Sequence, residues 1–133
     1  MLVLVTGGAG FIGSNLVRLL LRDGSNVRIL DDFSTGLRAN IEGLDVDVRQ
    51  GCLTDANFVD TAVAGVDSVV HLAARGSVPR SIAEPRQTHD VNATGTLNVL
   101  EAVRKQGAQI IFSSPSSVYG SNKALPKNED MWT

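Results

Sequence analysis

The chain has 133 residues, of which 43% are hydrophobic and 20% charged, and its formal net charge at pH 7 is −2. This length and composition are typical of one ordinary globular domain that can bury a layered core. The small net charge gives no reason to expect nucleic acid or an anionic membrane surface as a partner.

Other features of the sequence narrow the class further. No apolar stretch approaches the length of a membrane span, and no basic-then-apolar leader precedes the first predicted strand, so we expect a cytoplasmic chain with no membrane partner. The single cysteine, Cys52, cannot form an internal disulfide. Because no cluster of cysteine and histidine has zinc-binding spacing, we expect no bound metal.

Strands and helices alternate along the chain. Strands are predicted at residues 2–6, 26–31, 45–50, 67–72 and 108–113, and helices at 11–23, from 54 or 55 onward, and at 90–105. Residues 33–40 form a polar loop, and residues 114–133 show no clear period. This alternation predicts an α/β fold, a Rossmann-like doubly wound parallel sheet of about five strands with right-handed crossovers.

Each predicted helix carries an apolar stripe that is expected to face the sheet. The three stripes are Ile12, Leu16, Leu19 and Leu20; Phe58, Val59, Ala62 and Val63; and Val91, Leu97, Leu100 and Val103. Thr54 or Asp55 is expected to cap the second helix. His71 ends a buried strand and is predicted to be a core histidine bonded to the backbone rather than a catalytic one.

The segment from Leu2 to Gly13 reads LVLVTGGAGFIG and combines a buried strand, a glycine-rich turn and the start of a helix. Gly7, Gly8, Gly10 and Gly13 satisfy both G-x-G-x-x-G and G-x-x-G-x-x-G. These glycines permit unusual backbone angles, close approach of a diphosphate to the main chain, and tight packing of the helix on the strand. The unpaired N–H groups at the helix N-terminus favour that diphosphate.

An acidic residue follows at a matching distance. Asp31 ends the second strand, 18 residues after Gly13, about where a dinucleotide site places the carboxylate that accepts the ribose hydroxyls. A carboxylate there repels the 2′-phosphate of NADP, so we predict NAD as the cofactor. Strand, glycine turn, helix and carboxylate together predict a dinucleotide site rather than a plain tight turn.

Six motifs occur in order along the chain: TGGAGFIGS (6–14), DDFSTG (31–36), VVHLAA (69–74), SVPRS (77–81), VNATGTLNVLEAVR (91–104) and SVYG (117–120). The chain therefore resembles the extended short-chain dehydrogenase/reductase family, in its NAD-dependent sugar-nucleotide epimerase/dehydratase branch, and within it the UDP-glucose 4-epimerases. The resemblance covers the whole chain but only the N-terminal half of a typical member. It implies that residues 1–133 are an NAD-binding Rossmann domain, incomplete and without its substrate domain.

The resemblance also implies roles for individual residues. The positions implied for NAD are Gly7, Gly10, Phe11, Ile12, Gly13, Asp31, Asp32, Phe33, Ser34, Thr35, Gly36, Cys52, Leu53, Leu72, Ala73, Ala74, Arg75 and Asn92. Those implied for the nucleotide-sugar substrate are Ser77, Val78 and Ser81. The implied chemistry is transient hydride transfer from the sugar C4 to NAD and back to the other face. The resemblance also implies a possible homodimer, in which the helix predicted at 90–105 takes part in the interface together with a helix that this chain lacks.

Two positions depart from the family's pattern. Cys52 stands where the family has an aspartate after Gly51, and because a thiol is a poor acceptor, an adenine contact worth about 1 kcal/mol is expected to be lost. Pro115 stands where the family has its catalytic serine or threonine. This leaves Ser114 or Ser116 as the replacement catalytic hydroxyl.

The family's catalytic Tyr-x-x-x-Lys is absent from the chain. In relatives the tyrosine transfers the proton, and the lysine lowers its pKa. Tyr119 and Lys123 have the right spacing, but the Gly-Ser-Asn between them is a poor helix former, so this pair is not predicted to be catalytic.

The leading hypothesis is the NAD-binding portion of a UDP-glucose/UDP-galactose type 4-epimerase, inactive by itself. One alternative is a 4,6-dehydratase, decarboxylase or reductase of the same branch. The dehydratases and decarboxylases carry acidic residues where this chain has Ser116 and Ser117, which argues against these two activities. The other is a naturally short, non-catalytic NAD-binding module, with which Cys52 and Pro115 are consistent. If the domain is truncated, its fifth strand is predicted to expose an edge and apolar surface, which favours self-association or low stability relieved by NAD.

Overall fold

The computed structural model describes residues 1–132, apart from the side chain of Ser116. Its centre is a sheet of five parallel strands in the order β3-β2-β1-β4-β5. The strands are β1 (Leu2–Thr6), β2 (Asn26–Asp31), β3 (Asp47–Gln50), β4 (Ser68–His71) and β5 (Gln109–Phe112). The prediction of a doubly wound parallel sheet is confirmed, and each strand lies within the segment predicted for it.

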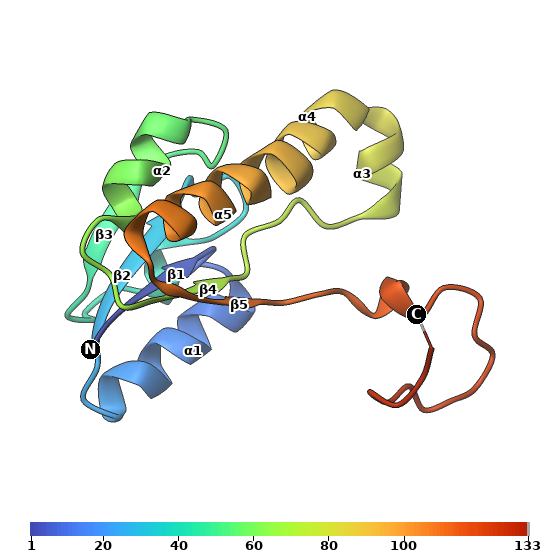
Figure 1. The fold of residues 1–133 in the computed structure, drawn as a ribbon, viewed down its shortest axis with the longest axis horizontal. Helices are drawn as coiled ribbons and strands as arrows, with labels where there is room; N and C mark the ends of the chain where they lie inside the picture. The colour runs from blue at the N-terminus through green and yellow to red at the C-terminus, as the bar shows by residue number, and fades with distance from the viewer. Residues whose placement is uncertain (133) are drawn as a thin grey trace.

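Helices cover both faces of this sheet. Figure 1 shows α1 (Phe11–Arg22) on one face, and α2 (Ala56–Val63) and α5 (Gly95–Gln106) together on the other. Two short helices, α3 (Val78–Ala83) and α4 (Pro85–His89), and a π-helical turn, η2 (Asp90–Thr94), lead into α5. Two 3₁₀ turns, η1 (Arg38–Asn40) and η3 (Ser116–Tyr119), complete the described elements.

The two short helices α3 and α4 are absent from the sequence-based expectation. Each begins at a proline-containing first turn, which is compatible with a helix start because the first amides need no intrahelical partner. Each is also too short to display a helical period. At α2 the expectation is confirmed, because the Asp55 carboxylate accepts a hydrogen bond from the Phe58 N–H at 3.0 Å.

The sheet has a separate core on each face, because successive side chains of a strand point to opposite sides. One core, under α2 and α5, comprises Leu4, Leu30, Leu53, Val59, Ala62, Val63, Val66, Val69, Val99, Ala102 and Val103. The other, under α1, comprises Val3, Val5, Ala9, Val17, Val27, Ile29, Ile41 and Val70. The continuous apolar runs of β1 and β4 therefore each supply both cores.

Two predicted apolar stripes are partly wrong. The inner face of α1 runs through Gly13 and Val17, which leaves Ile12 and Leu19 exposed on its flank. The inner face of α5 runs through Val99, Ala102 and Val103, so that Leu97 and Leu100 are also exposed. In both helices a glycine at the contact, Gly13 or Gly95, lets the backbone approach its neighbour closely and so sets the buried face.

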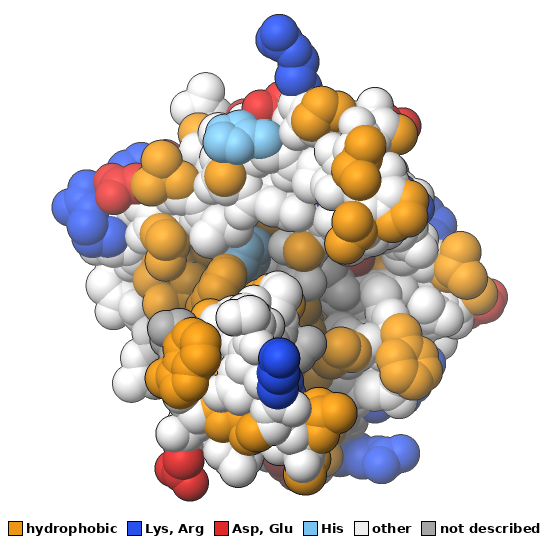
Figure 2. All heavy atoms as spheres, turned by 90° about the vertical axis from the view of Figure 1, so that its right-hand side faces the viewer, with side chains coloured by type: hydrophobic (Ala, Val, Ile, Leu, Met, Phe, Trp, Pro, Cys, Tyr) orange, Lys and Arg blue, Asp and Glu red, His pale blue; other side chains and the backbone are white. Residues whose placement is uncertain are grey.

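The C-terminal segment leaves the sheet after β5. Figure 1 shows it running away from the helices, and Figure 2, seen from that side, shows apolar side chains around a hollow between this segment and the rest of the molecule. Among residues 1–132, no helix is long and apolar enough to cross a membrane.

Candidate functional site

The candidate site lies at the carboxyl edge of the sheet, beside the central strand β1. The chain moves from β1 to β2 on one side and returns to β4 on the other side, so this edge is a topological switch point of the sheet. Such points form ligand-binding crevices in open α/β folds because the loops on the two sides diverge. Here the loops that follow β1, β2, β3 and β4 line one cavity.

The glycine-rich loop forms the floor of this cavity. Gly7 has φ +69°, and a Cβ on it would lie 2.9 Å from the backbone of Ala73. A Cβ on Gly13 would lie 2.2 Å from the Gly7 carbonyl oxygen. Gly10 precedes α1 without a side-chain cap, which leaves the first amides of that helix available to an anion.

The Asp31 carboxylate holds two loops together. One of its oxygens accepts the Ala9 N–H and the other accepts the Phe33 N–H, each at 2.9 Å, and the residue is buried. Asp31 nonetheless lines the cavity, where each oxygen retains acceptor capacity. The neighbouring Asp32 is exposed, and its carboxylate accepts the Ser34 N–H at 2.8 Å.

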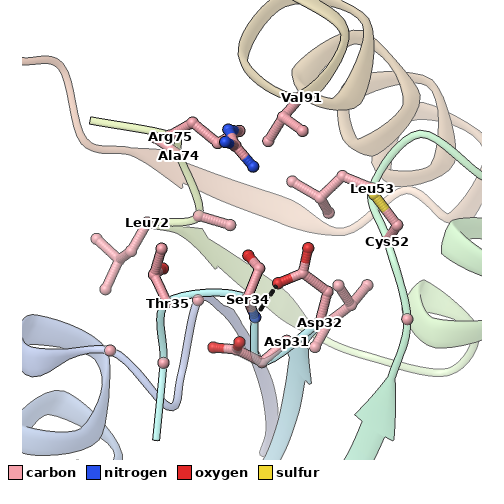
Figure 3. Close-up of a pocket in the computed structure, with 16 residues that line it drawn as sticks. Asp31, Asp32, Ser34, Thr35, Cys52, Leu53, Leu72, Ala74, Arg75 and Val91 are labelled. Carbon is pink, nitrogen blue, oxygen red and sulfur yellow. Dashed lines mark hydrogen bonds between the residues drawn. The ribbon is translucent and has the colours of Figure 1, made fainter. Parts of the chain in front are cut away.

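Figure 3 shows how these groups face one another. Arg75 and Val91 lie on the upper side of the cavity, and Asp31 and Asp32 lie on the lower side. Residues expected from the sequence that line the cavity are Gly7, Gly10, Asp31, Asp32, Ser34, Thr35, Gly36, Cys52, Leu53, Leu72, Ala73, Ala74 and Arg75.

Other expected residues lie elsewhere. Phe11, Ile12, Gly13 and Phe33 do not line the cavity, and the side chains of Phe11 and Ile12 are exposed at the start of α1. The cavity also includes three residues that were not anticipated: Leu30, Gly51 and Val91. Leu30 and Gly51 directly precede expected site residues, whereas Val91 reaches the cavity from η2, a position without a local sequence signal.

A second cavity continues from the first across the segment 72–75, which lines both. It is lined by His71, Leu72, Ala73, Ala74, Arg75, Gly76, Asn92, Thr96, Phe112, Ser113, Ser114 and Pro115. Of the predicted catalytic positions, Ser114 lines it together with Pro115, and the Ser116 side chain lies outside the described part of the structure. Ser113 and Thr96 are polar lining residues that sequence reasoning missed.

Arg75 is held at the junction of the two cavities. The Asn92 amide accepts its N–H at 2.7 Å and donates to its carbonyl at 3.1 Å. The guanidinium pairs with Glu84 at 2.6 Å, and in the better orientation of its amide Gln87 bridges the same two side chains. The Arg75 Nε is buried and has no partner among the described residues.

The segment predicted to face the substrate forms the start of α3. Ser77 and Ser81 line neither cavity, and Val78 is exposed. The Ser77 hydroxyl caps α3 by accepting the Arg80 N–H at 3.4 Å, and the Ser81 hydroxyl donates to the Val78 carbonyl at 2.8 Å.

No helix joins Tyr119 to Lys123. Tyr119 ends η3, and Gly120, with φ +52°, turns the chain out of the helical region. The pair is therefore not placed on one helical face, in agreement with the poor helix-forming sequence between them.

His71 is buried as predicted, but the prediction of a backbone partner is wrong. Its two ring nitrogens contact the hydroxyls of Thr6 and Thr96, at 2.7 and 3.0 Å. These hydroxyls come from β1 and α5, which are far from His71 in the sequence, so the local pattern could not reveal them. Burial lowers the pKa of His71 below its ordinary value.

A parallel doubly wound sheet with a glycine loop and a carboxylate at its switch point places the chain in the Rossmann-like class of α/β proteins. Within that class, the chain belongs to the NAD dependent epimerase/dehydratase family, whose model matches residues 3–133.

Two similar proteins illustrate the range of the family. UDP-glucuronic acid decarboxylase 1 of Danio rerio is 38% identical over 130 residues, which are 98% of this chain and 31% of the relative. UDP-glucose 4-epimerase of Lactobacillus helveticus is 38% identical over 133 residues, 98% of this chain and 40% of the relative. The chain therefore spans less than half the length of these relatives.

Solved structures give the same picture. UDP-glucose-4-epimerase from Stenotrophomonas maltophila with bound NAD and formylated UDP-arabinopyranose superposes with a TM-score of 0.90 at 33% identity, over 100% of this chain and 42% of that one. The UDP-glucose 4-epimerase of Thermus thermophilus in complex with NAD has a TM-score of 0.86 at 38% identity, over 98% and 43% of the two chains.

Proposed function

We propose that residues 1–133 are the NAD-binding Rossmann domain of a sugar-nucleotide 4-epimerase of the UDP-glucose/UDP-galactose type. The observation that carries the proposal is the single cavity joining the glycine loop, Asp31 and the segment 72–75. It is supported by the similar epimerase structures, which contain NAD. The substrate-binding part would come from chain outside these residues.

Each part of the cofactor has a chemically suitable partner in this arrangement. The first amides of α1, with the loop at Gly7 and Gly10, would hold the diphosphate. Asp31 and Asp32 would accept the ribose hydroxyls, and Cys52 with Leu53 would border the adenine. The nicotinamide would extend past the segment 72–75 into the second cavity.

When bound, NAD would supply transient hydride acceptance and return at the sugar C4. The residues of this chain would bind and orient it, and Asn92 would do so indirectly by holding the main chain of Arg75. Ser114, from the second cavity, is the described hydroxyl available to replace the one missing at Pro115. Without the Tyr-x-x-x-Lys pair the chain is expected to turn over no substrate, because loss of a general acid/base lowers the rate by about 10²–10⁴-fold.

Calorimetric titration of the 133-residue chain with NAD, and with NADP as the control, tests the proposal. We expect micromolar NAD binding and at least about tenfold weaker NADP binding, because Asp31 and Asp32 would repel a 2′-phosphate on the bound ribose. NAD should also protect the half-buried Cys52 thiol from alkylation, since that thiol lines the same cavity. A folded chain that binds neither nucleotide would refute the proposal.

A decarboxylase of the same family is the second candidate, because the Danio rerio relative is a UDP-glucuronic acid decarboxylase. Against it, Ser117 offers no carboxylate ahead of Tyr119. A longer natural chain containing Tyr-x-x-x-Lys would separate the candidates: release of CO₂ from UDP-glucuronic acid would indicate the decarboxylase, and interconversion of UDP-glucose and UDP-galactose the epimerase. A chain that ends naturally at this length and binds NAD without turnover would indicate a non-catalytic binding module.

A further inference from the structure

Three polar side chains, Thr6, His71 and Thr96, form a hydrogen-bonded chain next to the segment 72–75. This segment is the wall that the two cavities share. His71, the last residue of β4, is 2% exposed and stands between β1 and α5. Its Nδ1 is 2.7 Å from the Thr6 hydroxyl, and its Nε2 is 3.0 Å from the Thr96 hydroxyl. The Phe112 ring of β5 stacks on the imidazole with 5.8 Å between ring centroids.

The direction of these hydrogen bonds follows from counting protons. The Thr96 hydroxyl donates its one proton to the Asn92 carbonyl at 2.7 Å, so its oxygen can only accept from His71. His71 therefore carries a proton on Nε2. In the neutral ring Nδ1 is then an acceptor, and the Thr6 hydroxyl must donate to it.

This direction leaves the Thr6 oxygen free to act as an acceptor. It accepts the backbone N–H groups of Leu72 and Ala73, each at 3.2 Å. These residues begin the wall of the cofactor cavity, whose far end at Arg75 is held by Asn92. The two ends of the wall are thus held by Thr6 of β1 and Asn92 of η2.

We propose that His71 is a positioning residue for the cofactor site. As a neutral imidazole protonated on Nε2, it orients the Thr6 hydroxyl so that the hydroxyl oxygen accepts the N–H groups of Leu72 and Ala73 and holds this part of the wall. The proposal rests on the proposed NAD-binding function of that wall. His71 itself touches neither of the backbone N–H groups that it controls, and it acts through Thr6.

A charged imidazole is incompatible with this arrangement. With a proton on Nδ1 as well, the ring would compete with the Leu72 and Ala73 N–H groups for the Thr6 oxygen, and the Thr6 proton would lose its acceptor. The side chains that bond to or stack on the ring, Thr6, Thr96 and Phe112, carry no charge that could stabilise it. The charged side chain lining the same cavity is Arg75, which is paired with Glu84 and supplies no negative charge to the ring.

Long-range ¹H–¹⁵N NMR of the imidazole in the 133-residue chain tests the protonation state and hydrogen-bond direction of His71 without any ligand. We expect a neutral His71 ring with its proton on Nε2 at pH 7.5. A ring protonated on Nδ1, or a cationic ring at that pH, would overturn the proposal whether or not the chain binds NAD. Absence of NAD binding by the wild-type chain would instead count against the proposed function.

Two threonine substitutions then test the link to binding. Thr6→Val keeps the shape but removes the hydroxyl, and Thr6→Ser keeps the hydroxyl. We expect NAD affinity to fall about tenfold in Thr6→Val, as for the loss of a buried hydrogen-bonding group, and to be largely restored in Thr6→Ser. Thr61→Val, which removes an exposed hydroxyl on α2, is the control and should leave the affinity unchanged.

The pH profile of NAD affinity distinguishes this role from general support of the fold. Affinity, measured over the pH range in which circular dichroism shows the chain folded, should decline as the pH falls toward the lowered pKa of His71, where the ring gains its second proton. An affinity of the folded chain that stays unchanged while NMR shows His71 gaining its second proton, or equal losses in Thr6→Val and Thr6→Ser, would contradict the proposal.

Discussion

At the end of β2, the Asp31 carboxylate accepts the N–H groups of Ala9 and Phe33 and also lines the cofactor cavity. The same side chain thus shapes the glycine loop and presents an acceptor to the proposed ribose. Substituting Asp31 would disturb both, so loss of binding in such a variant could not be assigned to either role. Substitutions of Cys52 and His71 give results that are easier to interpret.

Cys52 lies where the resemblance to the family implies an aspartate, and its sulfur accepts the Thr54 hydroxyl at 3.1 Å. We predict that Cys52→Asp tightens NAD binding about fivefold, because a carboxylate accepts the adenine amino group better than a thiol does and a hydrogen bond contributes about 1 kcal/mol. Calorimetry checks the change, with Cys52→Ser, whose hydroxyl is shorter, as the control. Weaker binding in Cys52→Asp than in Cys52→Ser would show that the adenine lies elsewhere.

The lowered pKa of His71 also predicts a pH dependence of stability. As the pH falls below about 6.5, the unfolded chain takes up a proton on this residue before the folded chain does, so the free energy of unfolding decreases until the lowered pKa is passed. Urea unfolding between pH 7.5 and 5 measures the slope. This slope should be smaller in His71→Asn. Asp47 does not contribute to it, because the Arg49 and Arg28 guanidinium groups hold the pKa of Asp47 below 3.8, outside the measured range.

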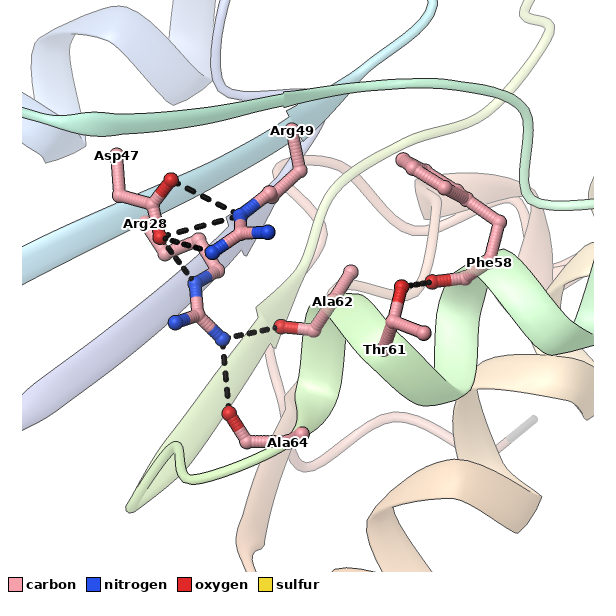
Figure 4. A network of polar contacts seen from close by, with 7 residues as sticks. All are labelled: Arg28, Asp47, Arg49, Phe58, Thr61, Ala62 and Ala64. Carbon is pink, nitrogen blue, oxygen red and sulfur yellow. Dashed lines mark hydrogen bonds and ion pairs between the residues drawn. The ribbon is translucent and has the colours of Figure 1, made fainter.

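At the scale of elements, a polar network joins the edge strand β3 to the rest of the sheet and to α2 (Figure 4). The Arg28 guanidinium of β2 donates to Asp47 at 2.7 Å and to the carbonyls of Ala62 and Ala64, at 2.8 and 2.9 Å, at the end of α2. Because β3 has four residues and no buried side chain, this network supplies contacts that a hydrophobic core would otherwise provide.

We predict that Arg28→Met lowers the free energy of unfolding by about 1–3 kcal/mol, since it removes the donor to the Ala62 and Ala64 carbonyls and one of the two partners of Asp47. Arg49→Met is the matched control, because Arg49 bonds to the same Asp47 from an exposed position and should contribute less than about 0.5 kcal/mol. Equal losses in the two variants, measured by urea unfolding, would show that the α2 carbonyls contribute nothing.

The entry into α1 depends on Gly13, where a Cβ would lie 2.2 Å from the Gly7 carbonyl oxygen. Gly13→Ala is predicted to lower the free energy of unfolding by about 1–3 kcal/mol through overpacking and to abolish NAD binding as the helix moves from the loop. Gly24→Ala, at φ +78° with open space around it, should destabilise by about 1–2 kcal/mol while leaving NAD affinity intact. If Gly13→Ala retained its NAD affinity, the start of α1 would not be part of the proposed diphosphate site.

At the scale of the whole molecule, the two edges of the sheet differ. β3 is charged, which discourages pairing with another strand, whereas β5 exposes 62% of Ile111 and 53% of Phe112. The described C-terminal segment runs away from β5 instead of covering it (Figure 1). Apolar surface on an unpaired edge favours association with a second copy.

We therefore predict that the 133-residue chain self-associates through β5. Light scattering after size exclusion should show a mass above 14.1 kDa that depends on concentration. Ile111→Lys should reduce association, whereas Leu19→Lys, at an exposed apolar residue on α1, should not. A monomer at all concentrations would contradict the prediction.

Much of this architecture could be predicted from local patterns. The order of strands and helices, the change from apolar strand to glycine loop, and Asp31 at the end of β2 all follow from short-range periodicity and turn chemistry. The structure brings the glycine loop and Asp31 to one edge of the sheet. The predictions that were wrong concern contacts between residues that are distant in the sequence. The buried faces of α1 and α5 and the partners of His71 are set by elements that pack on them, which hydrophobic periodicity alone does not specify.

The sequence alone therefore determined the fold class and the position of the nucleotide loop, because glycine conformations and alternating hydrophobicity act over a few residues. Only the tertiary structure decided that Val91 lines the cavity, that Asn92 holds Arg75, and that His71 is linked to β1 and α5. Those relations arise when crossover connections bring separate elements to one edge of the sheet, so their hydrogen-bond partners are fixed by packing.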